Sequence, residues 1–358
     1  MFYNNADDWI NEVQEKNTDI TSNVFLLFEN QPADILRSIE RSSHRIENCE
    51  KIIIKTSCEA PHSSVWFEIS RMLQQRGFNK NSIMIIDMGA PLPENIIEWT
   101  QFNHPFLTGR LPESQSQTKD KIFVSLARIP KPYRVLFTVE LLRKNLVHQN
   151  TSIVSCGVAN EVFDNDWKQI IPPEYRDLFP IAPFGLLDKP TASSTLNYKE
   201  FSGALINVIQ ETGFNEGYFF DITDKLKPTK RLNTDAWDRI TFTEKSFKCF
   251  ILKQVPLFLS SPGSVEYVRS LGFDVFDDFV DHSYDTVVDP FVRIQMVATE
   301  LERLYKILIN SDTTDYSRMI ENFDERSNKN FLTSVELSDK FTRLEQEAIR
   351  KFLLGHSI

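Results

Sequence analysis

The chain of 358 residues is long for a single hydrophobic core, so its length predicts two domains. Hydrophobic residues make up 41% and charged residues 25% of the sequence, as in an ordinary globular protein. The formal net charge of -10 argues against broad electrostatic affinity for nucleic acid, although it does not exclude a local basic groove.

The four cysteines are far apart and lack the paired spacing of metal ligands, which predicts reduced, mostly buried thiols: Cys49, Cys58, Cys156 and Cys249. No apolar run approaches the roughly 20 residues that a membrane-spanning helix needs. The first residues lack the basic and then apolar plan of a signal peptide. We therefore expect a soluble, cytoplasmic protein without a membrane partner.

Short apolar runs alternate with amphipathic segments in the first third of the chain. The elements predicted there are a short helix around residues 9–13, strands at 24–28, 51–56 and 82–87, and helices that begin at Pro32 and Pro61, the second stopping at Gly77. This alternation predicts a parallel α/β domain over residues 1–118. The polar segment 112–121 has no periodicity and is expected to be the linker.

The alternation resumes after the linker and predicts a second α/β domain over residues 119–334. Its expected elements are strands at 121–126, 152–155, 204–209 and 255–259, helices through 135–142 and 246–253, after Ser264 and from Pro290, and a long irregular connection at 158–200. Residues 275–281 are expected to form a short strand and turn. A loop is expected at 312–315 within a polar segment, and a last helix at 335–354.

Charged residues follow two of the predicted strands of this domain. Arg128 and Arg134 come after strand 121–126 and in the first turns of the next helix, and Glu211 and Thr212 follow strand 204–209. The carboxyl ends of parallel strands form the usual ligand edge of an open α/β sheet. Two alternatives stay open, because arginines near prolines often cover loop carbonyls and Glu211 is also suited to cap the following turn.

The stretch 240–273 carries the densest chemistry. Thr243, Glu244 and Lys245 open one predicted helix, and the segment with Ser261, Gly263 and Ser264 opens another after a short strand. Helix N-termini suit a phosphate, a lysine adds a point charge, and a glutamate accepts hydrogen bonds from sugar hydroxyls. Taken alone, the first turn is also that of an ordinary protein surface with a helix-capping threonine.

These residues resemble a family. The blocks that carry the resemblance are Thr243-Glu244-Lys245-Ser246-Phe247-Lys248, Ser261-Pro262-Gly263-Ser264-Val265-Glu266-Tyr267, Leu271-Gly272-Phe273 and Asp281-His282-Ser283-Tyr284-Asp285. They are similar to the C-terminal half of phage-associated glycosyltransferase-like proteins, and Thr-Glu-Lys-x-Phe is similar to an element of fucosyltransferase-type enzymes. The resemblance covers about residues 119 to 305 and also includes Glu211 and Thr212.

The resemblance implies a fold of two Rossmann-like α/β domains that face a cleft, the GT-B-like arrangement. It implies that residues 1–118 form the acceptor side, that residues 119–334 bind a nucleotide-activated sugar, and that the helix 335–358 packs back on the first domain. If the protein is phage-encoded, the implied location is the host cytoplasm.

Several kinds of site have no support in the sequence. There is no Walker loop, no Gly-x-Gly-x-x-Gly, no paired cysteine motif and no pair of histidines at zinc-binding spacing. Asp277, Asp278 and Asp281 do not fit a calcium-binding loop and are expected to be solvated. We therefore expect a metal-independent site without a tightly bound cofactor.

The expected function is transfer of a sugar from a nucleoside-diphosphate donor to a hydroxyl acceptor. Lys245, Arg128 or Arg134 would stabilise the leaving diphosphate, and Glu211 and Glu244 would orient hydroxyls. Glu59 and His62, after strand 51–56, are weak candidates for the general base. The alternative is an inactive module that binds a sugar nucleotide or a glycan. The sequence leaves the oligomeric state and the acceptor open; hydroxymethylated DNA bases are one acceptor class.

Overall fold

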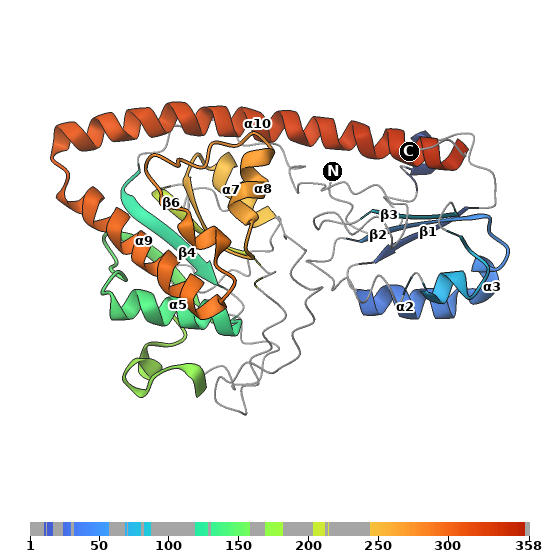
Figure 1. Ribbon diagram of the computed structural model, residues 1–358, viewed down its shortest axis with the longest axis horizontal. Coiled ribbons are helices and arrows are strands. Elements are labelled where there is room, and N and C mark those ends of the chain that lie inside the picture. Colours follow the sequence, from blue (N-terminus) through green and yellow to red (C-terminus); the bar gives the residue numbers. More distant parts are fainter. Residues whose placement is uncertain are drawn as a thin grey trace. The chain divides into compact units, whose positions relative to one another are not determined.

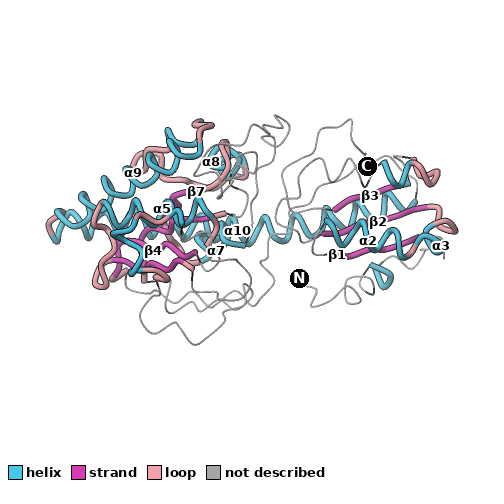
Figure 2. Tube along the Cα trace, turned by 90° about the horizontal axis from the view of Figure 1, so that it is seen from below, coloured by secondary structure: helices cyan, strands magenta, loops and turns pink. Residues whose placement is uncertain are grey.

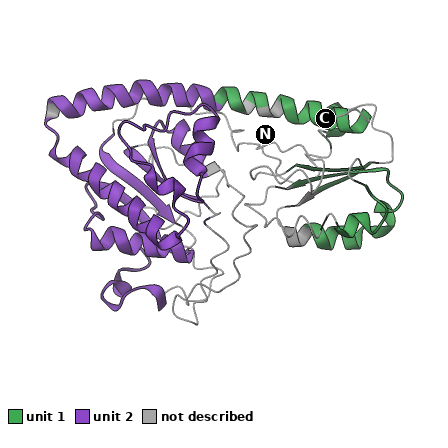
Figure 3. Ribbon diagram, viewed as in Figure 1, with its two compact units in different colours: residues 1–109, 238–243, 335–358 green, residues 110–237, 244–334 purple. Residues whose placement is uncertain are grey.

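The computed structural model describes residues 11, 13–16, 24–29, 32–56, 69, 71–79, 82–86, 119–127, 130–157, 169–181, 203–211, 214 and 244–354. The chain divides into two compact units (Figure 3). The first unit comprises Met1–Gly109, Asp238–Thr243 and Val335–Ile358, and the second comprises Arg110–Trp237 and Glu244–Ser334.

The first unit contains a parallel sheet of three described strands in the order β1-β2-β3 (Figure 1). Its strands are β1 (Val24–Glu29), β2 (Lys51–Thr56) and β3 (Ile83–Ile86). All three coincide with predicted strands to within one residue at each end. The reason is burial on both faces of the sheet, which requires continuous apolar runs such as the three isoleucines of β2.

Alternate residues of these strands pack into two separate cores. On one face, Phe25, Ile52 and Ile83 contact α2 (Pro32–Arg41), α3 (Ser43–Ile46) and the helical residues Ile69 and Leu73. On the other face, Ile53, Met84 and Ile86 contact Ala348, Ile349 and Phe352 near the end of the chain. The last residues of the sequence therefore complete the core of the first unit.

Helix α10 (Thr313–Leu354) is a single helix of 42 residues, so the loop expected at 312–315 and the helix start expected at 335 were wrong. Asp312 starts the helix, because its Oδ1 accepts hydrogen bonds from the N–H groups of Thr314 at 2.9 Å and Asp315 at 2.8 Å. The buried stripe of the first half has helical spacing but is mostly polar: Phe323, Ser327, Asn330 and Ser334. A search for apolar periodicity does not find such a stripe.

The second unit contains a four-stranded parallel sheet in the order β5-β4-β6-β7, whose strands are magenta in Figure 2. Its strands are β4 (Lys121–Ala127), β5 (Ser152–Cys156), β6 (Ala204–Gln210) and β7 (Val255–Leu259). The chain adds β5 on one side of β4 and then β6 on the other. This reversal makes the β4–β6 boundary a topological switch point, where open α/β sheets bind ligands.

Besides the first half of α10, this unit has four described α-helices. They are α5 (Pro132–Arg143), α7 (Glu244–Ile251), α8 (Ser264–Ser270) and α9 (Pro290–Asn310), with short 3-10 helices η3 (Pro173–Leu178) and η6 (Ser283–Thr286). Helices α5 and α9 lie side by side in Figure 1 and are joined by a 2.7 Å ion pair between Lys144 and Glu302. Asp289 starts α9 by accepting from the N–H groups of Phe291 and Val292.

The strand expected within 275–281 is absent from the structure, which has a turn there. Phe276 has a φ of 63°, in the left-handed region that β-strands do not use. Its N–H donates to Oδ1 of Asp274 at 2.8 Å and so is not available to a neighbouring strand. Val275 and Phe276 are nevertheless buried, and the ring of Phe276 packs edge-on against Phe323 of α10.

Two parallel sheets with helices confirm the α/β class and are compatible with a Rossmann-like fold. Among the described helices, none has both the length and the apolar character that crossing a membrane requires.

Asn330→Ala is expected to lower the free energy of unfolding of the second unit by about 1–3 kcal/mol, because buried main-chain groups lose their partner. Asn330 is 1% exposed. Its Nδ2 donates to the main-chain oxygen of Asp274 at 2.7 Å, and its Oδ1 accepts from the main-chain N–H of Asp274 at 2.8 Å. Urea unfolding measures the effect, with the exposed Asn328→Ala on the same helix as the control. Equal losses in the two variants would contradict this role of Asn330.

Candidate functional site

The switch point gathers side chains from three elements of the second unit. Helix α5 begins soon after β4 and places Tyr133 and Arg134 at the carboxyl edge of the sheet. Strand β6 ends at Gln210, which is followed by Glu211, and α7 then begins with Glu244. The parallel order of the strands therefore brings together residues that are more than 100 positions apart in the sequence.

The hydroxyl of Tyr133 is the centre of this group. It donates to the main-chain oxygen of Glu211 and accepts from Nε of Arg134 at 2.9 Å. Burial raises the pKa of Tyr133, and the positive charges of Arg134 and Lys245 oppose this shift in part. Tyr133 thus keeps its proton at neutral pH, and Lys245 lies close enough to act on it electrostatically.

Arg134 is 4% exposed and is engaged with the protein itself. In addition to its bond to Tyr133, its Nη2 donates to the main-chain oxygen of Gln210 at 3.0 Å. Arg134 therefore covers the carbonyl of the last residue of β6, which is close to the alternative that arginines near prolines cover loop carbonyls. Contact of Arg134 with a donor phosphate stays a prediction.

Glu211 joins the end of β6 to the start of α7. Its carboxylate is buried, with 1% exposure, and its Oε1 accepts from Oγ of Ser246 at 2.6 Å. Ser246 is fully buried and was missed as a site residue, because in the sequence it is one of several polar residues in a helix. Lys245, beside it in the first turn of α7, is partly exposed.

The N-terminus of α8 is occupied by a carboxylate of the protein. Oδ1 and Oδ2 of Asp285 accept from the N–H groups of Val265 at 3.0 Å and Glu266 at 3.2 Å, and its main-chain oxygen accepts from the N–H of Gly263. Gly263 has a φ of 80°, which glycine adopts without strain. These N–H groups are therefore engaged within the protein, and binding of a phosphate at the start of α8 stays a prediction.

Ser261 and Ser264 also form a hydrogen bond with each other. Oγ of Ser264 donates to the main-chain oxygen of Ser261 at 2.7 Å, and both side chains are buried. This contact closes the turn that leads from β7 into α8. Contact of Ser261, Gly263 or Ser264 with a donor stays a prediction.

The structure does not describe the side chains of six of the predicted site residues. Glu59, His62, Arg128, Thr212 and Thr243 lie outside the described residues, as does the side chain of Glu244. Their assignments stay predictions.

Two residues that the sequence did not single out extend the group around Tyr133. The ring of Phe214 stacks on the ring of Tyr133 with centroids 4.3 Å apart. The guanidinium carbon of Arg293, from the first turns of α9, lies 4.6 Å from the centroid of Phe214. A third cation thus lies near Arg134 and Lys245, where the sequence showed only a polar residue within a mainly apolar helix.

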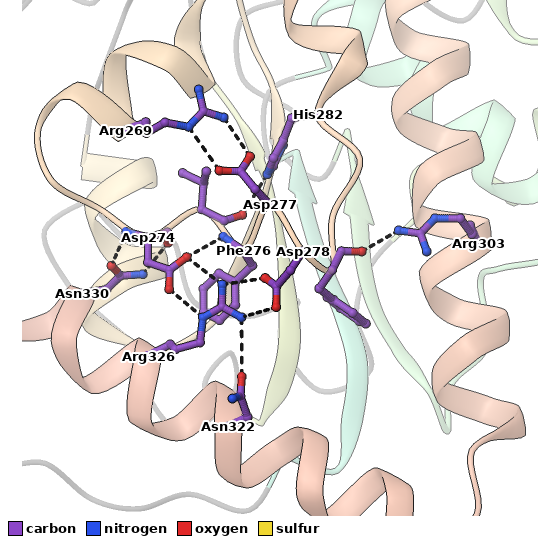
Figure 4. A network of polar contacts seen from close by, with 12 residues as sticks. Arg269, Asp274, Phe276, Asp277, Asp278, His282, Arg303, Asn322, Arg326 and Asn330 are labelled. Atoms are coloured by element: carbon purple, nitrogen blue, oxygen red, sulfur yellow. Dashed lines mark hydrogen bonds and ion pairs between the residues drawn. The ribbon is translucent and has the colours of Figure 1, made fainter.

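A hollow of about 940 Å³ lies beside the start of α8 and is lined by charged residues. Figure 4 shows its neighbourhood, in which Arg269 pairs with Asp277 at 2.8 Å and Arg326 pairs with Asp278 at 2.8 Å. These aspartates are therefore paired with arginines rather than only solvated, as we had expected. Four of the carboxylates that line the hollow are engaged by arginines or main-chain N–H groups of the protein, and we assign no ligand to it.

Metal ligands are not clustered in the described part of the chain. No group of three or more histidine, cysteine, aspartate or glutamate side chains there is arranged to hold a metal ion. Comparison with models of protein families, with curated proteins and with solved structures found no match to this sequence.

His282 belongs to a hydrogen-bond chain that fixes its tautomer. Its Nε2 lies 2.8 Å from the main-chain oxygen of Val275 and must carry a proton to bond with it. Nδ1 then accepts from the hydroxyl of Tyr284 at 2.9 Å, and that hydroxyl oxygen accepts from the N–H of Phe258 at 3.1 Å. Burial lowers the pKa of His282, so the neutral ring is the folded form.

The stability of the protein is expected to fall as the pH drops below about 6.5, the pKa of an unfolded histidine. Because the pKa of His282 is lowered by folding, the unfolded state binds more protons in this window, and acidification favours unfolding. Asp274 and Asp281, whose pKa values are also lowered, lose their contribution only at pH values below about 4.

Denaturant unfolding at pH 7.5 and 5.5 measures this effect, with His282→Gln as the comparison. Glutamine keeps a donor for Val275 and does not titrate, so the variant should lose less stability between the two pH values than the wild type. The same loss in both proteins would show that other groups cause the dependence.

Proposed function

We propose that this protein is a glycosyltransferase that moves a sugar from a nucleoside-diphosphate donor to a hydroxyl acceptor. The observation that carries the proposal is the meeting of Lys245, Tyr133 and the Glu211–Ser246 pair at the switch point of the second sheet. This is the edge where an open α/β sheet binds a nucleotide. The resemblance of the Thr243–Lys248 and Asp281–Asp285 blocks to phage-associated glycosyltransferases supports the same reading.

In this proposal the leaving diphosphate is stabilised by fixed positive charge. Negative charge develops on the bridging phosphate oxygen as the sugar departs, and preorganised cations stabilise it more than they stabilise the ground state. Lys245 lies in the first turn of α7, where main-chain N–H groups and the helix dipole also favour an anion. Arg128 would act beside it, so that the reaction needs no metal ion.

Carboxylates would orient hydroxyl groups of the donor. Glu211 uses Oε1 to accept from Ser246, and a carboxylate oxygen can accept more than one hydrogen bond. Glu244 would contribute in the same way. The two α/β units would face each other across a cleft, with the acceptor on the first unit and Glu59 or His62 as general base.

A second candidate is a module that binds a sugar nucleotide or glycan without turnover. It is favoured by the engagement of Arg134 with Gln210 and of the α8 N-terminus with Asp285, which leaves fewer groups for catalysis. Incubation with a panel of nucleotide sugars separates the two. Release of nucleoside diphosphate in the presence of an acceptor supports the transferase, and binding without release supports the module.

The acceptor is tested separately. Hydroxymethylated DNA bases are one proposed class, although the net charge of -10 works against DNA binding. Mass analysis of nucleosides after reaction with hydroxymethylcytosine DNA would detect the added sugar. An unchanged nucleoside profile with every donor would remove DNA from the proposal.

Lys245→Ala is expected to lose about 2–4 kcal/mol of transition-state stabilisation, the range for removal of one electrostatic donor from a reacting oxyanion. Its effect on folding should stay below about 1 kcal/mol, because a partly exposed lysine at a helix start contributes little to stability. Donor binding by calorimetry, turnover and a melting curve on each variant provide the measurement.

Lys248→Ala is the matched control, since Lys248 is a partly exposed lysine one turn further along the same helix. It should bind and turn over the donor with a much smaller loss. A Lys245→Ala protein with unaltered donor affinity and turnover would remove Lys245 from the site.

A further inference from the structure

Arg293 is a buried cation with half of its hydrogen-bonding edge unused. The side chain is 1% exposed, and Nη1 donates to the main-chain oxygen of Val287 at 2.5 Å. Nε and Nη2 are buried and have no hydrogen-bond partner among the residues that the structure describes. Buried polar groups in native proteins are nearly always paired, so these two need an explanation.

The nearest carboxylates are committed elsewhere. Asp285 accepts from the N–H groups of Val265 and Glu266 at the start of α8, and Asp289 accepts from those of Phe291 and Val292 at the start of α9. Both act on Arg293 only through their fields, which raise its pKa, while burial lowers it to about 10. The guanidinium is therefore still charged at neutral pH.

The unused atoms form one geometric unit. Nε–H and Nη2–H point in parallel from the same edge of the planar guanidinium, and this edge matches the two oxygens of a phosphate or carboxylate. The face of the same guanidinium lies over Phe214, whose ring stacks on Tyr133. The edge is thus held beside the group of residues at the switch point.

We propose that the Nε–Nη2 edge of Arg293 binds a phosphate oxyanion of a ligand at the switch point of the second sheet. The identity of that ligand as the diphosphate of a nucleotide sugar rests on the proposed function. The oxyanion site itself is inferred from the two unpartnered nitrogens of Arg293. Because both nitrogens are covered, the oxyanion reaches them when neighbouring side chains move aside.

Such a site makes stability and binding respond in opposite directions. Replacing a buried charge that has no ion-pair partner and two unsatisfied donors by an apolar side chain of similar length removes a desolvation cost, which outweighs the loss of its one bond to Val287. A structural arginine behaves differently, since its loss leaves its partners unsatisfied and destabilises the fold. Arg293→Met is therefore expected to raise the melting temperature and to weaken phosphate binding.

Inorganic pyrophosphate is the probe, and the shift of the melting temperature with its concentration reports binding to the folded protein. The wild type should be stabilised, and Arg293→Met should bind at least tenfold more weakly. Arg293→Lys keeps the charge but not the two-pronged edge, so it should also bind more weakly; it provides the test if the methionine variant fails to fold. Arg303→Met is the control on the same helix, because Arg303 is already paired with Glu300 at 2.5 Å. It should keep pyrophosphate binding and should not gain stability.

The outcomes separate this inference from the proposed function. Pyrophosphate binding that depends on Arg293, in a protein that transfers no sugar from any donor, would keep the oxyanion site and remove the transferase. Absence of pyrophosphate binding in the wild type, or unaltered binding in both Arg293 variants, would overturn the site whatever the turnover. So would a destabilised Arg293→Met protein that still binds pyrophosphate.

Discussion

The parallel pairing of β4 with β6 is the contact on which the second unit depends. Because β4 pairs with β5 on one side and with β6 on the other, the strand order reverses there, and open α/β sheets bind ligands at such a point. This location was predictable from the sequence, since charged residues follow apolar runs at Glu211 and after residue 127. The hydroxyl of Tyr133 then joins α5 to the end of β6, because it donates to the main-chain oxygen of Glu211.

Acidic side chains of this protein occupy the positive ends of its helices, and this choice shapes the candidate site. Asp285, Asp289 and Asp312 accept main-chain N–H groups at the starts of α8, α9 and α10. The carboxylates of Asp285 and Asp289 therefore accept hydrogen bonds from main-chain N–H groups at helix starts instead of from the guanidinium of Arg293. Sequence patterns show that an aspartate precedes a helix, but not that Asp285 serves a helix that begins 21 residues earlier. The contacts of Ser246 and Arg293 could not be predicted from residue spacing either, because they join segments that lie far apart in the sequence and meet only in the folded protein.

The strands were predictable because burial on both faces demands continuous apolar runs, as in β2 and β7. The first half of α10 was not, because its buried stripe holds Ser327, Asn330 and Ser334 beside the single apolar residue Phe323. The turn at Phe276 was not predicted, for a related reason. Its apolar residues look like a strand, but a side-chain acceptor on Asp274 takes the N–H group that a strand would use.

The order of synthesis matters for a chain with this topology. The three strands of the first sheet leave the ribosome early, yet one of their faces contains Ile53, Met84 and Ile86, which pack against Ala348 and Phe352. Until those late residues emerge, this apolar face lacks its partner and is a natural surface for chaperones. The core of the first unit therefore cannot be completed before Phe352 is synthesised, and the whole of the second unit has been translated by then.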